Sequence, residues 1–139
     1  MSQVRGTINR IDVMGWLGGD PELRFTPNGK RHCRISVATK YITGRDSEGR
    51  YTYDTEWISV EMWEKLAELC NTYLHKGSRV LVTGGLRTDS WVDKETKQTH
   101  YRTFVRADSV LFLDTRTDQP EVTQAVEEAA AQATEDIPF

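Results

Sequence analysis

Residues 51–77, YTYDTEWISVEMWEKLAELCNTYLHKG, decide the fold because the spacing of their apolar side chains changes along the stretch. Over residues 51–62 polar and apolar residues alternate, which is the two-residue period of a strand. Over residues 63–74 the apolar residues recur every three to four positions, which predicts a helix. Gly77 is a natural C-cap for that helix. This stretch therefore predicts a strand that leads directly into a helix.

The two-residue period continues on both sides of this stretch, and Gly84-Gly85 suits a bulge within one of the strands. A short extended piece is expected at residues 22–25, before a Pro-Asn-Gly turn. The other main strands are expected at residues 7–16, 31–41, 79–91 and 100–113. Five main strands with one helix between the third and fourth predict a mainly β protein. The expected fold is a small antiparallel barrel of the oligonucleotide/oligosaccharide-binding (OB) type.

The chain divides into two parts of different composition. Residues 1–113 are predicted to form the binding and oligomerisation domain. Residues 114–139 are too polar to build a core, and we expect a flexible, disordered tail there. The net charge is −3 at pH 7, but the tail carries seven acidic residues and one arginine, so the domain itself is basic. A basic domain with an acidic tail suggests two separate functions.

Several classes of protein are not expected from this sequence. There is no apolar run long enough to span a bilayer, and no apolar stretch follows residues 1–5 to make a secretory signal. Cys33 and Cys70 form no C-x-x-C pair, so we expect free buried thiols in a reducing cytoplasm. The histidines and cysteines have no zinc spacing, and there is no nucleophile or phosphate-loop motif. We expect no enzyme activity, metal or cofactor.

Aromatic and basic residues together indicate a nucleic-acid site, because single-stranded bases stack on exposed rings while cations follow the phosphates. Trp57 is out of phase with Ile58, Val60 and Met62, which places it on the opposite face of its strand. The alternative is that the tryptophans are core residues; Trp16, before a Gly-Gly turn, is not placed in the site. The candidate DNA-binding residues are Trp57, Trp63, Trp91, Arg10, Arg34, Lys40, Lys65, Lys76 and Arg87.

The last four residues, Asp136, Ile137, Pro138 and Phe139, combine acidic charge, an aromatic ring and a free carboxylate. An apolar pocket ringed by basic residues on another protein could capture such an end. The alternative is an inert chain terminus. We predict that these residues bind partner proteins.

An ordered set of motifs resembles the bacterial single-stranded DNA-binding protein family. The motifs are GWLGGDPELRF (15–25), PNG (27–29), TEW (55–57), WEKLAE (63–68), YLHKGS (73–78), GLRT (85–88), Trp91 and DIPF (136–139). No single motif is decisive, but their order and spacing are highly specific. The similarity covers about residues 5–113 and the last few residues.

The resemblance implies an OB barrel assembled as a homotetramer, around which single-stranded DNA wraps. It implies base stacking on Trp57, Trp63 and Trp91, with Trp63 in place of a common Phe. It also implies DNA contacts at Arg10, Lys65, Lys76 and Arg87. The tail would recruit replication, recombination and repair enzymes through Phe139. Such a protein is expected in the cytoplasm, associated with the nucleoid.

Some positions depart from the family pattern. A stacking Trp often found after the second strand falls on Thr43, and the sequence leaves open whether Tyr41 takes its place in the DNA-binding site. Ser59 and Asp89 replace residues that are often basic, and His75 stands where Arg is usual. The expected DNA-contact surface therefore carries fewer positive charges than is usual in the family.

Two other classes of function stay open from the sequence alone. The barrel could serve mainly to oligomerise an interaction adaptor whose tail binds partners. The same fold could also bind RNA or an oligosaccharide, because a fold does not determine its ligand. We expect sequence-independent binding and protection of single-stranded DNA, with recruitment of partner enzymes through the tail.

Overall fold

A computed structural model describes residues 4–114. Over these residues the chain forms six strands and one helix, which confirms the predicted mainly β fold. The short extended piece at residues 22–25 is a strand in its own right. The elements are β1 (Ile11–Leu17), β2 (Glu22–Phe25), β3 (Arg31–Arg45), β4 (Tyr51–Trp63), α1 (Glu64–Tyr73), β5 (Arg79–Val92) and β6 (Thr99–Phe112).

Five of these strands close into an OB barrel. The sheet order is β1-β5-β6-β4-β3-β2, and an additional β1–β3 pairing joins its ends. β1 and β2 share one edge of β3, where Val37 and Ala38 pair with β1 and residues 31–34 pair with β2. Closure leaves none of the five barrel strands with a fully open edge, which is how such barrels avoid unpaired backbone.

One junction of the barrel is parallel, although the sequence predicted an antiparallel barrel. β4 and β6 run in the same direction and pair at Val60–Val105 and Glu61–Arg106, while the other junctions are antiparallel. A closed ring with an odd number of strands cannot alternate direction all the way round. At least one neighbouring pair must therefore be parallel, and in this chain the pair is the short β4–β6 junction.

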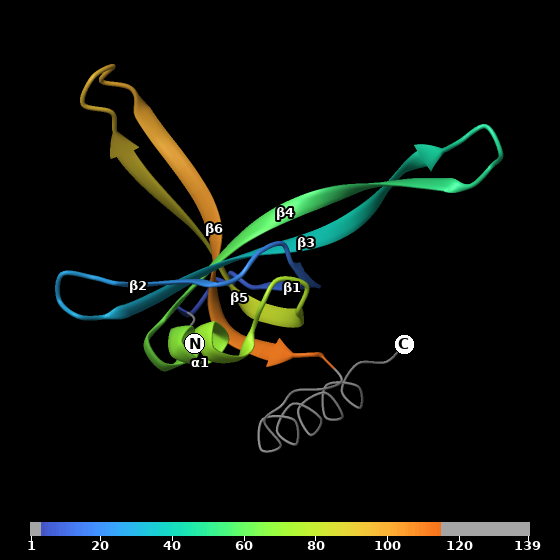
Figure 1. Cartoon of the computed structure of the whole chain (residues 1–139). Coiled ribbons are helices and arrows are strands. Elements are labelled where there is room, and N and C mark those ends of the chain that lie inside the picture. The colour runs from blue at the N-terminus through green and yellow to red at the C-terminus, as the bar shows by residue number, and fades with distance from the viewer. Residues whose placement is uncertain (1–3, 115–139) are drawn as a thin grey trace.

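The core lies inside the barrel and follows the predicted alternation. Ile35 and Val37 of β3 and Val60 and Met62 of β4 are at most 2% exposed. The amphipathic helix α1 adds Ala67 and Cys70 to this core from one end of the barrel (Figure 1). Strand side chains alternate between faces, so each inward apolar residue leaves its neighbour on the outer surface.

The ends of the helix differ from the prediction. Trp63 is the last residue of β4, and α1 ends at Tyr73 with Leu74 as its C-cap. Leu74 has extended backbone angles, which end the helix, and its side chain is buried in the core. Gly77 is not the cap. It has φ +90° within the following turn, and its N–H donates to the carbonyl of Leu17.

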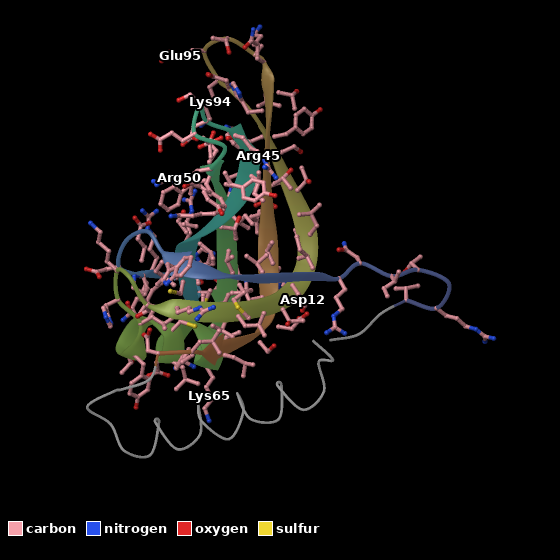
Figure 2. The ribbon with its side chains drawn as sticks, turned by 90° about the vertical axis from the view of Figure 1, so that its right-hand side faces the viewer. Asp12, Arg45, Arg50, Lys65, Lys94 and Glu95 are labelled. Atoms are coloured by element: carbon pink, nitrogen blue, oxygen red, sulfur yellow. The ribbon has the colours of Figure 1, made fainter. Side chains whose placement is uncertain are left out.

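Two hairpins, β3–β4 and β5–β6, extend beyond the barrel as diverging arms (Figure 1). Their tips, with Arg45 and Arg50 on one arm and Lys94 on the other, lie at the end opposite to Lys65 of α1 (Figure 2). The predicted bulge is present, because the β5–β6 register shifts between Thr83 and Gly84. Within residues 4–114, no helix is long and apolar enough to cross a membrane.

Candidate nucleic-acid interface

Trp57 lies on the outer face of β4, as its phase in the sequence predicted. Its side chain is 58% exposed, whereas Val60 and Met62 of the same strand are completely buried. Since residues two apart share a face of a strand, Trp63 is on the same side as Trp57. Trp63 is partly buried, and its ring is tilted against that of His32 with 4.6 Å between ring centroids. The outer face of β4 therefore carries two of the three predicted stacking residues.

A cleft of about 610 Å³ opens beside Trp57. Arg34 of β3 lines this cleft, and among residues 4–114 its guanidinium group has no ion pair or side-chain hydrogen bond. An aromatic wall beside an unpaired cation suits a base with its phosphate. The cleft is lined by Gly18, Gly19, Asp20, Glu22, Arg34, Ile35, Ser36, Trp57 and Ser59.

Lys40 and Tyr41 lie on opposite faces of the arm formed by β3 and β4. Lys40 pairs with Thr55, on the face of Trp57. Tyr41 pairs with Asp54 on the opposite face and is 47% exposed, so the structure does not bring it to Trp57. Tyr53 does share the face of Trp57 and is 60% exposed. Sequence reasoning missed Tyr53, although its even spacing from Trp57 along β4 was the signal that could have found it.

The second arm carries Trp91 and Arg87 on the continuation of this outer face. Glu61 of β4 pairs with Arg106 of β6, and Phe104 of β6 pairs with Arg87, so the face passes from β4 to β5 across the parallel junction. Trp91 is 49% exposed, and its ring stacks on that of His100 at 5.7 Å. The predicted aromatic residues thus lie on one outer face but are divided between two arms.

A charged network crosses the outer face between the two arms, and the sequence did not predict it. Glu61 is 6% exposed, and its two carboxylate oxygens lie 2.6 Å from His32 Nε2 and 2.6 Å from Arg102 Nη1. Arg102 also lies 3.2 Å from Asp89 and stands over the ring of Phe104. The hydrogen bond to Glu61 raises the pKa of Arg102. Here a buried carboxylate is held by side chains from both neighbouring strands, His32 of β3 and Arg102 of β6.

The remaining predicted basic residues are scattered. The backbone N–H of Lys76 donates to Asp20, which lines the cleft, so this residue lies at the cleft's edge. Arg10 precedes β1, because the strand begins at Ile11 and not at residue 7 as predicted, and it pairs with Asp12 at 3.4 Å. Lys65 is on α1, at the end away from the arms (Figure 2).

Among the described residues there is no group of histidine, cysteine or carboxylate side chains suited to hold a metal. Cys33 and Cys70 are free and buried, as predicted. Burial raises the pKa of Cys33 to about 11 and that of Cys70 to about 12, which makes both poor nucleophiles. The predicted partner-binding residues Asp136, Ile137, Pro138 and Phe139 lie outside the described residues.

Comparison with known proteins agrees with this geometry. Residues 8–113 match the single-strand binding protein family. The chain is also similar to a solved structure of a Plasmodium falciparum SSB in complex with ssDNA, with a TM-score of 0.68 and 26% sequence identity over 81% of this chain and 100% of that one. Proteins of this family bind DNA and are not enzymes. The match covers most of the chain, and the chain therefore belongs to the single-strand binding protein family.

Proposed function

We propose that this protein binds single-stranded DNA through the outer face of β3, β4, β5 and β6, without reading its sequence. The observation that carries the proposal is the exposed Trp57 ring forming one wall of a cleft that Arg34 also lines, with no ion pair to that arginine from residues 4–114. Every base has a π face, so stacking on an indole tolerates any sequence. The similarity to an SSB solved with ssDNA supports the same ligand.

The proposed contacts divide into stacking and charge. Trp57, Trp63 and Trp91 stack bases, and each stack contributes about 1–3 kcal/mol. Phosphates are neutralised by basic residues on this face and, as the strand wraps around the barrel, by others away from it, which releases counterions and makes binding salt-dependent. The basic contacts proposed are Arg10, Arg34, Lys40, Lys65, Lys76 and Arg87.

We further propose that the barrel assembles as a homotetramer and that residues 114–139 act separately from it. The tip ending in Phe139 would recruit replication, recombination and repair proteins, while the barrel protects the DNA. The acidic composition of the tail and its resemblance to the family's tip support this division. A cytoplasmic, nucleoid-associated location stays a prediction.

The first test is a titration with oligo(dT) at low and high salt, followed by tryptophan fluorescence. We expect strong quenching and saturable binding, with log K falling against log salt by about 0.7 for each phosphate contact. Absence of both binding and quenching would reject the proposal. It would favour the alternative that the barrel mainly oligomerises an interaction adaptor whose tail binds partners. Competition between DNA and RNA oligomers tests the choice of nucleic acid, since tighter RNA binding would contradict it.

Deleting residues 115–139 separates DNA binding from recruitment. We expect the truncated chain to bind oligo(dT) at least as tightly as the full chain, because the acidic tail repels phosphates. Capture of replication and repair proteins should be lost, and it should also be lost when Phe139 alone is removed. A truncated chain that no longer binds DNA would contradict the proposed division.

A further inference from the structure

Trp63 lies at the end of β4, and one side of its ring is occupied by His32 of β3. The two residues are cross-strand partners, and their ring centroids lie 4.6 Å apart with 56° between the ring planes. While His32 stays in this place, the indole cannot turn towards β3. A base can therefore stack only on the other side of the ring, and His32 decides how that side is presented.

His32 is held in turn by Glu61, which precedes Trp63 by two residues and shares its face of β4. The side chain of His32 is 18% exposed, and its Nε2 lies 2.6 Å from Oε1 of Glu61. The imidazole thus contacts a carboxylate and an indole that β4 places at alternate positions. If the carboxylate released His32, the ring would be free to leave Trp63.

Glu61 is itself fixed by the second arm. Its Oε2 lies 2.6 Å from Nη1 of Arg102 on β6, and Arg102 also contacts Asp89 of β5 at 3.2 Å. The guanidinium of Arg102 stands over the ring of Phe104, 4.7 Å from its centroid. One continuous chain of contacts therefore runs from β5 and β6, through Glu61, to the ring against which Trp63 rests.

Neither stability nor charge favours a carboxylate at this position. A buried ion pair often stabilises a protein no more than apolar residues of similar volume would, because both charges lose water. His32, Glu61 and Arg102 also line a cavity of about 190 Å³ that shares Glu22 and Arg34 with the cleft beside Trp57. A negative charge so close to the proposed DNA path repels phosphates, so a positional role accounts better for Glu61.

We propose that Glu61 is a positioning residue for Trp63. By holding His32 against the indole, it orients the ring for base stacking before DNA arrives. A group that is already fixed loses less conformational freedom on binding, which favours a tighter complex. This inference rests on the proposed function and explains how one of its stacking residues is oriented.

The test compares two variants of Glu61 that differ only in the contact with His32. Glu61→Gln and Glu61→Leu remove the same charge and have side chains of similar size, but only Gln keeps an oxygen that can accept a hydrogen bond from Nε2. Each is made in the otherwise wild-type chain and in a chain carrying Trp63→Ala, and binding of labelled oligo(dT) is measured by anisotropy.

We expect Glu61→Leu to bind oligo(dT) about three- to thirty-fold more weakly than Glu61→Gln, a loss within the value of one base stack. The two variants should bind equally once Trp63 is alanine, because there is no indole left to orient. Equal affinities in the presence of Trp63 would overturn the proposal. So would the same difference in both backgrounds, since it would show that Glu61 acts independently of the indole.

The orientation of the ring can also be followed directly, without DNA. The chain has four tryptophans, so replacing Trp16, Trp57 and Trp91 by Phe leaves Trp63 as the only one. We expect time-resolved anisotropy to show little local motion of this indole with Glu or Gln at position 61 and more motion with Leu. Unchanged motion would overturn the proposal. This result does not depend on the proposed function, which fails only if the wild-type chain binds no oligo(dT).

His32→Ala keeps the proposal testable if Glu61→Leu does not fold, because it leaves the ion pair between Glu61 and Arg102 in place. We expect a similar loss of affinity, again absent when Trp63 is alanine, together with greater motion of the indole. Wild-type affinity in a folded His32→Ala chain would overturn the proposal.

Discussion

The indole of Trp57 lies against the backbone of Gly18, two strands away in the barrel. A Cβ at residue 18 would lie 2.2 Å from Cζ3 and 2.8 Å from Cη2 of that ring. Gly18 has no positive φ, so a side chain is excluded by the ring and not by the backbone conformation. Because Gly18, the residue after β1, has no side chain, the exposed ring of Trp57 on β4 can lie against its backbone.

Gly18→Ala is expected to displace the Trp57 ring and weaken single-stranded DNA binding. The added methyl group would overlap the indole, so the ring must rotate or the loop must move. We expect a loss of about 1–3 kcal/mol, up to the value of a whole base stack, together with weaker fluorescence quenching. Oligo(dT) titration measures both effects.

Gly18→Ala in a chain that already carries Trp57→Ala is the control for this substitution. Without the indole the added methyl group has no ring to displace, so the double variant should bind oligo(dT) as tightly as Trp57→Ala alone. If Gly18→Ala by itself binds like the wild type, contact with Gly18 does not position the stacking ring.

Tyr53 and Tyr41 should respond differently to removal of their rings. Tyr53 shares the outer face of Trp57, whereas Tyr41 projects from the opposite face of the same arm. We expect Tyr53→Ala to weaken oligo(dT) binding by about 1 kcal/mol, and Trp57→Ala by about 1–3 kcal/mol. Tyr41→Ala should cause a smaller loss than either. A larger loss for Tyr41→Ala would mean that the strand follows the inner side of the arm.

Arg102 should contribute to stability more than to DNA binding, because Glu61 and Asp89 already neutralise it. Arg102→Gln leaves the carboxylate of Glu61 buried with His32 alone. We expect the free energy of unfolding in urea to fall by about 1–3 kcal/mol, between the ranges for exposed and buried pairs.

The double variant Glu61→Gln, Arg102→Gln removes both charges and should recover part of this loss. The slope of log K against log salt should stay at its wild-type value in the double variant. A slope reduced by about 0.7, the loss expected for Arg34→Gln, would show that Arg102 contacts a phosphate.

Cys33 and Cys70 should be unreactive in the folded protein. Their pKa values are raised by burial to about 11 and about 12, so the thiolate is scarce at pH 8. A thiol reagent should modify neither residue at pH 8 until urea unfolds the chain. Rapid modification of the native protein would show that the helix opens away from the barrel.

The same pKa values predict how stability varies at alkaline pH. The unfolded thiols ionise near pH 9.0 and the folded thiols only near pH 11 and above. The folded state therefore holds its thiol protons more tightly, and the resulting stability is complete below pH 9.0 and is lost as the pH rises towards 11. Urea unfolding at pH 8 and pH 10, compared with the Cys33→Ala, Cys70→Ala variant, measures this contribution.

Local patterns in the sequence were sufficient to predict the strands, the helix and the face of its strand on which Trp57 lies. The two-residue period of residues 51–62 gives way to helical spacing at residue 63, and both periods result from backbone geometry within a few residues. The same alternation separates Trp57 from Val60 and Met62. The charge difference between the domain and residues 114–139 is likewise a property of composition.

The tertiary structure decided which residues from different strands meet. The alignment of Trp16, Ala38 and Trp57 in one row across the sheet depends on two strand registers, and the contact of Gly18 with Trp57 depends on β1 lying beside β3. Glu61 finds Arg102 only because five strands close into a ring with one parallel junction. Periodicity determines which face of a strand a side chain occupies. Its neighbours across the sheet depend on strand order and register, and these are determined jointly by residues that are distant in the sequence.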